Sequence, residues 1–268
     1  MSAARVALAL LLLPAAVWAA VTAALWWQQE RLLFHPTPLA ADVHLATEPD
    51  VHESVVEVPG ARLSVLELRL AQPRGVVLFL HGNAGNLQGW FTDAAFYRRA
   101  GFDLVMPDYR GYGKSTGHIQ SEAQLHADMA AVWRAVAPRY AGKRVVLIGR
   151  SIGTGLAARL AADIQPDLTV LLSPYASIVG LARERFPWLP PQAVRYPLRT
   201  DEVIERIRGP VLLLHGRQDE IIPVSESRKL QALSPRVRLQ EIDGAGHNDL
   251  HLFPAYRDGL AGALDALR

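Results

Sequence analysis

Three residue types that together activate a serine nucleophile lie on separate loops of this 268-residue chain. Ser151 stands in the pattern Gly149-x-Ser151-x-Gly153, which is typical of a sharp turn between a strand and a helix. Asp219 and His247 each follow a later apolar run. A serine becomes a good nucleophile when a histidine takes its proton and a carboxylate orients that histidine. The pattern therefore predicts acyl transfer with Ser151 as nucleophile, His247 as base and Asp219 as acid.

Two backbone amides are candidates for stabilising the negative charge that this chemistry places on a carbonyl oxygen. Ile152 follows the nucleophile at the start of a predicted helix, where the helix dipole favours an anion. Asn83 lies in the loop "HGNAGN", directly after an apolar run. We predict that these two amides form an oxyanion hole. A glycine-rich turn with no catalytic role is the alternative for the loop.

The same stretch also contains a dinucleotide-binding pattern, formed by Gly153, Gly155 and Ala158. A dinucleotide fold needs an acidic residue at the end of the next strand to hold a ribose. Here the next apolar run ends in Ser173 and Pro174, so this second element is missing. The sequence therefore favours the nucleophile.

Two further motifs are incomplete. Residues 113–115 read GKS like the end of a P-loop, but Asp108 stands where that loop needs a glycine. His247 and His251 have the spacing of a zinc-binding helix, but Asn248 replaces the glutamate that such a helix carries. We therefore expect neither a metal ion nor an organic cofactor.

The elements that must position these residues follow from the apolar pattern. Continuous runs rich in valine and leucine predict buried parallel strands at 76–80, 103–106, 144–149, 168–173, 210–216 and 237–242. Helical stretches alternate with them at 122–137, 152–163, 225–233 and 254–267. Residues 55–58 and 63–70 alternate apolar with polar and predict a hairpin that turns at Pro59 and Gly60. This order predicts an α/β fold with a mostly parallel, doubly wound sheet, whose functional groups gather at the carboxyl ends of the strands.

The amino-terminal segment has no charged residue from Val6 to Trp27. At ~1.5 Å per residue, such a helix crosses a ~30 Å hydrocarbon core, with Trp26 and Trp27 in the aromatic belt. We predict a transmembrane helix; a signal peptide cleaved after Ala19 is the alternative. Arg5 and the amino terminus favour a cytoplasmic N-terminus, which places the catalytic domain outside the cytoplasm, in the periplasm if the source is bacterial.

Composition limits the other function classes. The chain has 28 basic and 26 acidic residues and no basic block, so nucleic acid is not an expected partner. It has no cysteine, which excludes disulfides, thiolate nucleophiles and cysteine-bound zinc. We predict an anchor or uncleaved signal at residues 1–31, a stem at 32–52 and one catalytic domain at 53–268.

Seven strings of the sequence resemble the alpha/beta hydrolase superfamily: "RLLFHP", "HGNAGN", "DYRGYGKS", "GRSIG", "SPYAS", "HGRQDEIIP" and "GAGHND". Over about residues 28–268, the chain is most similar to the membrane-anchored serine hydrolase branch, which has an esterase-like domain. The resemblance implies the same triad of Ser151, Asp219 and His247 and the same oxyanion amides. It also draws attention to Arg150, which precedes the nucleophile and either bears on acidic substrates or reaches solvent.

The segment 175–199 contains aromatic and proline residues but is short. We predict that it forms a small cap and that four of its side chains line an apolar, open acyl pocket: Leu181, Phe186, Trp188 and Leu189. Packing over the sheet is the alternative. The expected substrate is a small-molecule or lipid acyl ester or thioester, and the membrane is the expected partner. Lysophospholipase, protein deacylase and serine peptidase activities remain open, as does a membrane-tethered interaction module without activity.

Overall fold

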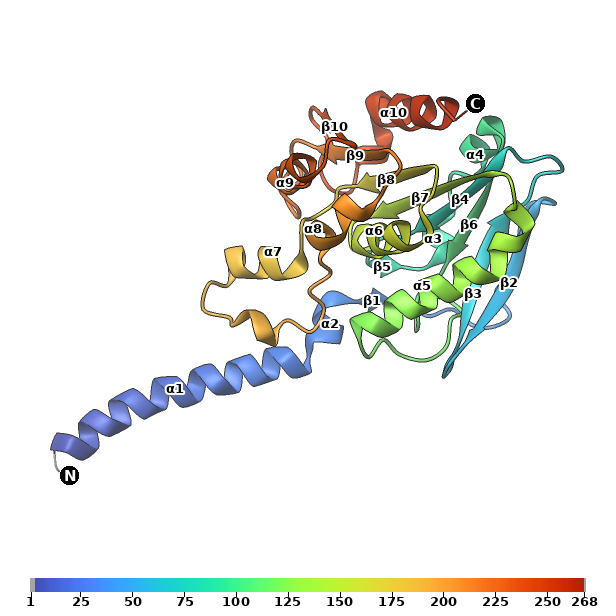
Figure 1. The fold of residues 1–268 in the computed structure, drawn as a ribbon. Coiled ribbons are helices and arrows are strands. Elements are labelled where there is room, and N and C mark those ends of the chain that lie inside the picture. Colours follow the sequence, from blue (N-terminus) through green and yellow to red (C-terminus); the bar gives the residue numbers. More distant parts are fainter. Residues whose placement is uncertain (1–2, 268) are drawn as a thin grey trace.

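An eight-stranded sheet forms the centre of the molecule (Figure 1). The computed structural model describes the backbone of residues 3–267 and the side chains of residues 12–267. The sheet has the strand order β10-β9-β8-β7-β4-β6-β3-β2. Its strands are β2 (Val51–Val58), β3 (Ala61–Leu68), β4 (Gly75–Leu80), β6 (Phe102–Pro107), β7 (Arg144–Arg150), β8 (Leu168–Leu172), β9 (Val211–Gly216) and β10 (Val237–Ile242).

The strands from β10 to β6 are parallel, whereas β3 is antiparallel to both β6 and β2. Successive residues of a strand point to opposite faces, and both faces of this sheet are covered. In β4, Val76, Leu78 and Leu80 pack into one apolar core, while Val77 and Phe79 pack into the other. Because both faces of these strands are buried, most positions along them are apolar, which explains the continuous apolar runs of the sequence.

Helices cover both faces of the sheet. The first core includes side chains of α5 (Glu122–Val136), α6 (Gly153–Ile164) and α9 (Ser225–Leu233). The second includes side chains of α4 (Ala94–Ala100) and α10 (Pro254–Asp265). The shorter elements are α2 (Gln29–Leu33), β1 (His35–Pro36), β5 (Ala84–Gly85), α3 (Leu87–Trp90), η1 (Ala137–Tyr140), α7 (Ile178–Arg185), η2 (Pro191–Ala193), α8 (Thr200–Val203), η3 (Ile204–Arg206) and η4 (Leu250–Leu252).

The predicted α/β fold with a mostly parallel sheet is confirmed. The hairpin is also confirmed, because β2 and β3 pair antiparallel and Val58 lies opposite Ala61. Helices α3 and α4 are not among the predicted elements, since their residues lack a clear helical repeat of apolar side chains.

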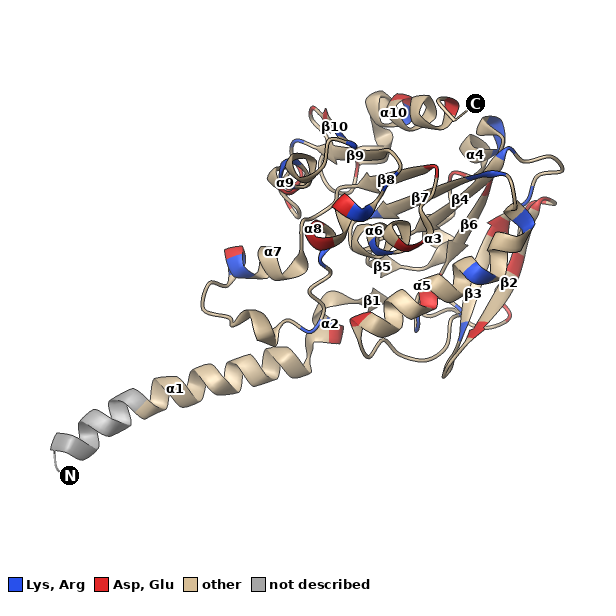
Figure 2. Ribbon diagram, in the orientation of Figure 1, with Lys and Arg blue, Asp and Glu red and all other residues tan. Residues whose placement is uncertain are grey.

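The N-terminal helix α1 (Ala3–Trp27) leads away from the domain (Figure 1). Between Leu12 and Trp27 it has no charged residue, while acidic and basic residues are interspersed over the domain (Figure 2). In the part of the chain with described side chains, no helix is long and apolar enough to cross a membrane. The predicted transmembrane helix is therefore not found, and its first residues, with Arg5, lie outside that part.

Candidate active site

The nucleophile candidate lies at the turn where β7 ends and α6 begins. Ser151 has a φ of 51°, in the left-handed region that side chains other than glycine rarely adopt. A Cβ on Gly149 would lie 2.6 Å from the carbonyl oxygen of Gly153, and a Cβ on Gly153 would lie 2.3 Å from that of Leu80. Both glycines are therefore required for the helix to start so close to the sheet.

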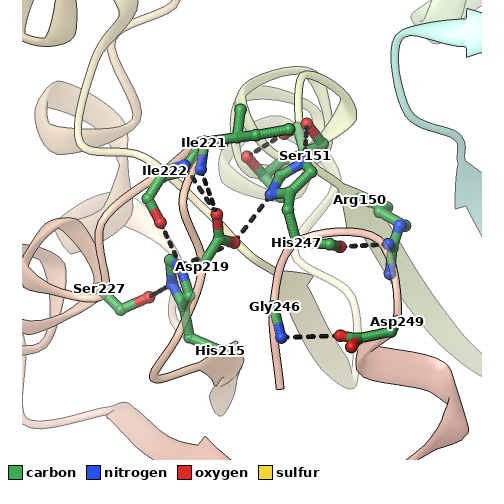
Figure 3. Close-up of polar contacts among 11 residues, drawn as sticks. Arg150, Ser151, His215, Asp219, Ile221, Ile222, Ser227, Gly246, His247 and Asp249 are labelled. Carbon is green, nitrogen blue, oxygen red and sulfur yellow. Dashed lines mark hydrogen bonds and ion pairs between the residues drawn. The ribbon is translucent and has the colours of Figure 1, made fainter. Parts of the chain in front are cut away.

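Three side chains from separate loops meet at this turn (Figure 3). The Nε2 atom of His247 is 3.0 Å from the Oγ atom of Ser151, and its Nδ1 atom is 2.7 Å from Oδ2 of Asp219. Because His247 and Asp219 are buried, water does not compete for this contact between them. The structure thus brings together the predicted nucleophile, base and acid in one hydrogen-bonded chain.

The carboxylate of Asp219 is held by several donors. Its Oδ1 atom accepts hydrogen bonds from the backbone N–H groups of Ile221 and Ile222, at 3.0 and 2.8 Å. Burial alone would raise the pKa of Asp219, but hydrogen bonds from His215, His247 and the Ile222 amide lower it well below its usual range. The acid therefore stays ionised and can stabilise a positive charge on the neighbouring imidazole.

A second buried histidine contacts the acid. The Nε2 atom of His215 is 2.8 Å from the carbonyl oxygen of Ile222 and 3.3 Å from Oδ2 of Asp219. Its Nδ1 atom is 2.7 Å from the hydroxyl oxygen of Ser227. Since a carbonyl can only accept, Nε2 carries the proton and the Ser227 hydroxyl donates to Nδ1. Sequence reasoning missed His215, although it stands four residues before Asp219 at the end of a predicted strand.

The loop predicted to supply an oxyanion amide lies against the nucleophile. A Cβ on Gly82 would be 3.7 Å from the Cβ of Ser151. Within the described chain, neither the N–H of Asn83 nor that of Ile152 donates a hydrogen bond to another group. Both amides are therefore available to a ligand, as an oxyanion hole requires.

The side chain of Asn83 fixes this loop to two other segments. Its Oδ1 atom accepts hydrogen bonds from the backbone N–H of His35 and from the hydroxyl of Tyr112, each at 3.1 Å. Strand β1, which begins at His35, also pairs with β5 in the same loop. The segment predicted as a stem thus packs directly against the candidate oxyanion loop.

A buried pair lies beneath the loop. The Nε2 atom of His81 is 3.3 Å from Oδ1 of Asp108, which also accepts a hydrogen bond from the amide of Leu87 at 3.1 Å. The ring of His81 packs against Tyr109 and Tyr112. Asp108, which stands at the position that breaks the P-loop pattern, thus anchors the loop before α3.

Arg150 does not reach solvent; it is only 7% exposed. Its Nη2 atom donates a 2.7 Å hydrogen bond to the carbonyl oxygen of His247, on the side of the imidazole away from Asp219 (Figure 3). Its guanidinium lies 5.8 Å from the centre of the Trp90 ring. Burial lowers the pKa of Arg150, although it remains a cation at neutral pH.

The four predicted acyl-pocket residues lie on α7 and the loop after it. Leu181 is partly buried against the core, Leu189 is half-buried, and Phe186 and Trp188 are exposed. The rings of Phe186 and Trp188 contact each other edge to face, with centres 6.2 Å apart. Their role in holding an acyl group remains a prediction.

This cap segment is tied to the amino-terminal helices. The indole N–H of Trp18 donates to the carbonyl oxygen of Trp188 at 3.1 Å. The side chain of Gln29 donates to the carbonyl of Ala193 at 2.9 Å and accepts from the amide of Arg195 at 2.6 Å. Sequence reasoning gave no sign of these contacts, because the partners are more than 160 residues apart.

Among the described residues, no three histidine or acidic side chains are grouped so that they could hold a metal ion. The pair of His247 and His251 is therefore not part of such a group. Every polar group that the triad needs is supplied by the chain itself.

Comparisons with known proteins agree with this geometry. A family model described as "Serine aminopeptidase, S33" matches residues 71–195, and one described as "alpha/beta hydrolase fold" matches residues 182–254.

The chain is 32% identical to alpha/beta hydrolase domain-containing protein 17C of Xenopus tropicalis, over 83% of this chain and 76% of that protein. It is 31% identical to an uncharacterized protein of Mycobacterium tuberculosis, over 98% of this chain and 94% of that protein.

Solved structures show the same fold. The esterase Pf2001 of Pyrococcus furiosus superposes with a TM-score of 0.69 at 20% identity, over 88% of this chain and 98% of that one. Alpha/beta hydrolase domain-containing protein 10 from mouse gives a TM-score of 0.63 at 20% identity, over 81% and 98%. At these identities the likeness concerns the fold.

Proposed function

The chain belongs to the alpha/beta hydrolase superfamily, and we propose that it is a serine hydrolase that cleaves carboxylic esters or thioesters through an acyl-enzyme on Ser151. The observation that carries this proposal is the unbroken chain of contacts from Ser151 Oγ through both ring nitrogens of His247 to Asp219. The strained turn at Ser151 supports the same chemistry, as do the amides of Asn83 and Ile152, which donate to no group of the described chain.

In the proposed mechanism, Ser151 Oγ attacks the acyl carbon while His247 Nε2 takes the hydroxyl proton. Asp219 stabilises the imidazolium, and the amides of Asn83 and Ile152 bind the oxyanion. His247 then gives the proton to the departing alcohol or thiol, which leaves the acyl group on Ser151. A water molecule, deprotonated by His247, attacks the acyl-enzyme and releases the acid.

Peptide hydrolysis is a second candidate, because one matching family model is described as a serine aminopeptidase. The acyl-enzyme chemistry is the same for an amide. Recognition of a free amino terminus needs an acidic side chain near the acyl carbon. Both signs of charge contact the loop of His247: Arg150 donates to the carbonyl of His247, and the carboxylate of Asp249 accepts from the amide of Gly246. The substrate panel below therefore decides between ester and peptide.

We also propose that the apolar amino-terminal segment holds the protein at a membrane, with the catalytic domain outside the cytoplasm. Leu12, Leu13, Val17 and Val21 are exposed on the described part of α1. Protease treatment of spheroplasts tests the placement. Digestion of the domain in intact spheroplasts supports it, and full protection would contradict it.

The main experiment is labelling with a fluorophosphonate probe beside a Ser151→Ala control. The proposal predicts that the wild type is labelled and the variant is not, and equal labelling of both would refute it. A panel of p-nitrophenyl esters, an acyl thioester and an aminoacyl p-nitroanilide then separates the substrate classes. Turnover of the anilide alone would favour the peptidase, and absence of both labelling and turnover would favour a non-enzymatic interaction module.

A further inference from the structure

A cavity of about 340 Å³ lies beside the candidate active site, on the face of the sheet covered by α4 and α10. Its walls include the apolar side chains of Phe79, Leu104 and Met106. Its polar lining comes mainly from other elements, with Arg150 at the end of β7, Tyr97 on α4 and Tyr256 on α10. The volume suits a small ligand or one part of a larger one.

Three buried donors of this cavity have hydrogen-bonding capacity that the described chain does not use. Arg150 makes one hydrogen bond, to the carbonyl of His247, although a guanidinium has five N–H groups. Tyr97 is 3% exposed and Tyr256 is 6% exposed, and neither hydroxyl has a hydrogen-bond partner within residues 12–267. These donor atoms are not among the fully buried polar atoms that lack a partner, so they open into the cavity. They can therefore bind a ligand that brings several acceptor atoms.

The charge of the cavity favours an anion. Arg150 and Arg257 both line it, and Asp93 is the carboxylate among the lining residues. Burial raises the pKa of Asp93, and the nearby Arg257 and Arg99 oppose this shift. Burial, with Arg150 and Arg257 nearby, lowers the pKa of His251, so that this imidazole is neutral at neutral pH. The lining thus holds two guanidinium groups and one carboxylate, while Asp219 and Asp249 interact with Arg150 from outside it.

The cavity adjoins two residues of the candidate triad through their neighbours in the chain. Arg150 is adjacent to Ser151 in the chain and hydrogen-bonds to the carbonyl of His247. Asn248, the residue after His247, lines the cavity. Neither Ser151 nor His247 lines the cavity, so a group held here is a part of the substrate remote from the reacting bond.

We propose that this cavity binds the phosphate or carboxylate of an anionic leaving group, so that the preferred substrates are acyl esters of a phosphorylated or carboxylated alcohol or thiol. The inference rests on the proposed serine hydrolase activity. Arg150 forms charge-assisted hydrogen bonds to the anion, and the hydroxyls of Tyr97 and Tyr256 complete its coordination. An apolar acyl chain is the competing occupant, favoured by the floor of Phe79, Leu104 and Met106.

Three hexanoyl esters with matched acyl groups test this assignment: those of glycerol, glycerol 3-phosphate and glyceric acid. The proposal predicts a higher kcat/KM for at least one of the two anionic esters than for the glycerol ester. Comparison of the two anionic esters shows whether the site prefers phosphate or carboxylate. Arg150→Gln lowers the ratio of anionic to neutral kcat/KM by about tenfold or more, because a charge-assisted contact is lost. Tyr256→Phe, which keeps the ring and the packing, lowers the same ratio by a smaller factor.

Arg134→Gln is the matched control, since Arg134 is exposed on α5, which covers the opposite face of the sheet, and it should leave the ratio as in the wild type. Equal kcat/KM for all three esters, or an anionic preference that survives in Arg150→Gln, would overturn the proposal. Equal kcat/KM for these three esters, together with a kcat/KM that rises with acyl chain length in a series of p-nitrophenyl esters, would assign the cavity to the acyl group instead.

Binding of inorganic phosphate to the Ser151→Ala protein, measured by calorimetry, separates this inference from the proposed function. Phosphate binding that Arg150→Gln abolishes supports the anion site even if no ester is turned over. Absence of phosphate binding in a protein that hydrolyses neutral esters would overturn the anion site and leave the hydrolase intact. Thermal unfolding of each variant shows whether it is folded.

Discussion

The Oδ2 atom of Asp219 lies 3.3 Å from Nε2 of His215, so the candidate acid contacts a second buried histidine besides His247. This contact helps to keep the carboxylate ionised and oriented. We predict that His215→Phe lowers kcat by about tenfold, equivalent to the loss of roughly 1.4 kcal/mol, because the buried carboxylate loses its contact with this imidazole. Steady-state kinetics with a p-nitrophenyl ester measures the effect.

His118→Phe is the control for that experiment, since His118 is an exposed histidine outside the site. It should keep the wild-type kcat. In serine proteases with the same kind of triad, replacing the acid lowers kcat by about 10⁴-fold. The decrease in kcat for His215→Phe should therefore be much smaller than that for Asp219→Asn. A kcat for His215→Phe equal to that of the control would show that His215 has no positioning role.

The stability of the fold should depend on the ionisation of Asp219. Burial opposes ionisation of this carboxyl, but hydrogen bonds from His215, His247 and the Ile222 amide lower its pKa in the folded state below the value of about 3.9 in an unfolded chain. Its contribution to stability is therefore present above about pH 4 and is lost as the pH falls toward the folded-state pKa. Urea unfolding at several pH values between 3 and 7 measures it.

Asp219→Asn is the reference for this comparison, because the amide does not titrate. The difference in free energy of unfolding between wild type and variant should shrink as the pH falls below about 4. A difference that grows on acidification would contradict the lowered pKa. Other carboxyl groups contribute equally to both proteins and cancel.

The tight turn around the nucleophile predicts the effect of a single methyl group. Gly153→Ala places a Cβ 2.3 Å from the carbonyl oxygen of Leu80, and backbone atoms of β4 must move to accept it. We expect a loss of at least about 2 kcal/mol in the free energy of unfolding, together with loss of fluorophosphonate labelling. Chemical denaturation and gel-based labelling measure the two effects.

Gly262 provides a contrast, because it is exposed in α10 and a Cβ there would meet nothing within 4 Å. Gly262→Ala should stabilise the protein by about 0.5–1 kcal/mol through the higher helix propensity of alanine. If the two substitutions change the free energy of unfolding by similar amounts, α6 can move away from β4 to accept the extra methyl group, and the prediction is wrong.

The candidate oxyanion loop depends on the hydroxyl of Tyr112, which donates to Oδ1 of Asn83. We predict that Tyr112→Phe lowers kcat by roughly fivefold and leaves KM nearly constant. Without this hydrogen bond the amide of Asn83 is held less firmly, and that amide stabilises the oxyanion of the transition state more than the bound substrate. Affinity for a trifluoromethyl ketone inhibitor should fall by the same factor. Tyr140→Phe, which removes a buried hydroxyl hydrogen-bonded to Asp103, should leave both quantities unchanged. A change in KM alone would contradict this role.

Much of the fold could be predicted because its determinants are local. Strands β4, β6, β7, β8 and β9 each appear as an apolar run, since parallel strands covered on both faces expose few residues. Ser151, Asp219 and His247 could be located because a glycine pattern marks the turn and the two partners follow apolar runs. The carboxyl ends of parallel strands meet at one edge of the sheet, which brings these loops together.

The contacts that sequence reasoning missed join segments with no shared local pattern. Nothing in the spacing of Arg150, Tyr97 and Tyr256 predicts that they line one cavity, because each belongs to a different element. The hydrogen bond from the backbone amide of His35 to Asn83 could not be predicted either. Every residue except proline has a backbone N–H, so the residue type gives no sign of this contact. Such sites depend on the packing of elements, which periodicity does not specify.

The last prediction concerns the contact between the amino-terminal helices and the cap segment. Gln29 is 9% exposed, and its side chain satisfies two backbone groups of that segment, the carbonyl of Ala193 and the amide of Arg195. Gln29→Ala leaves both groups without a partner, at a cost of about 1–3 kcal/mol for each if they stay buried. We therefore expect the segment to open locally, with faster amide exchange at residues 191–196 and little change in the sheet. Gln28→Ala, at the neighbouring exposed position, should exchange like the wild type. Equal exchange rates in the two variants would show that the helices do not hold the cap, whereas faster exchange confined to Gln29→Ala would show that they do.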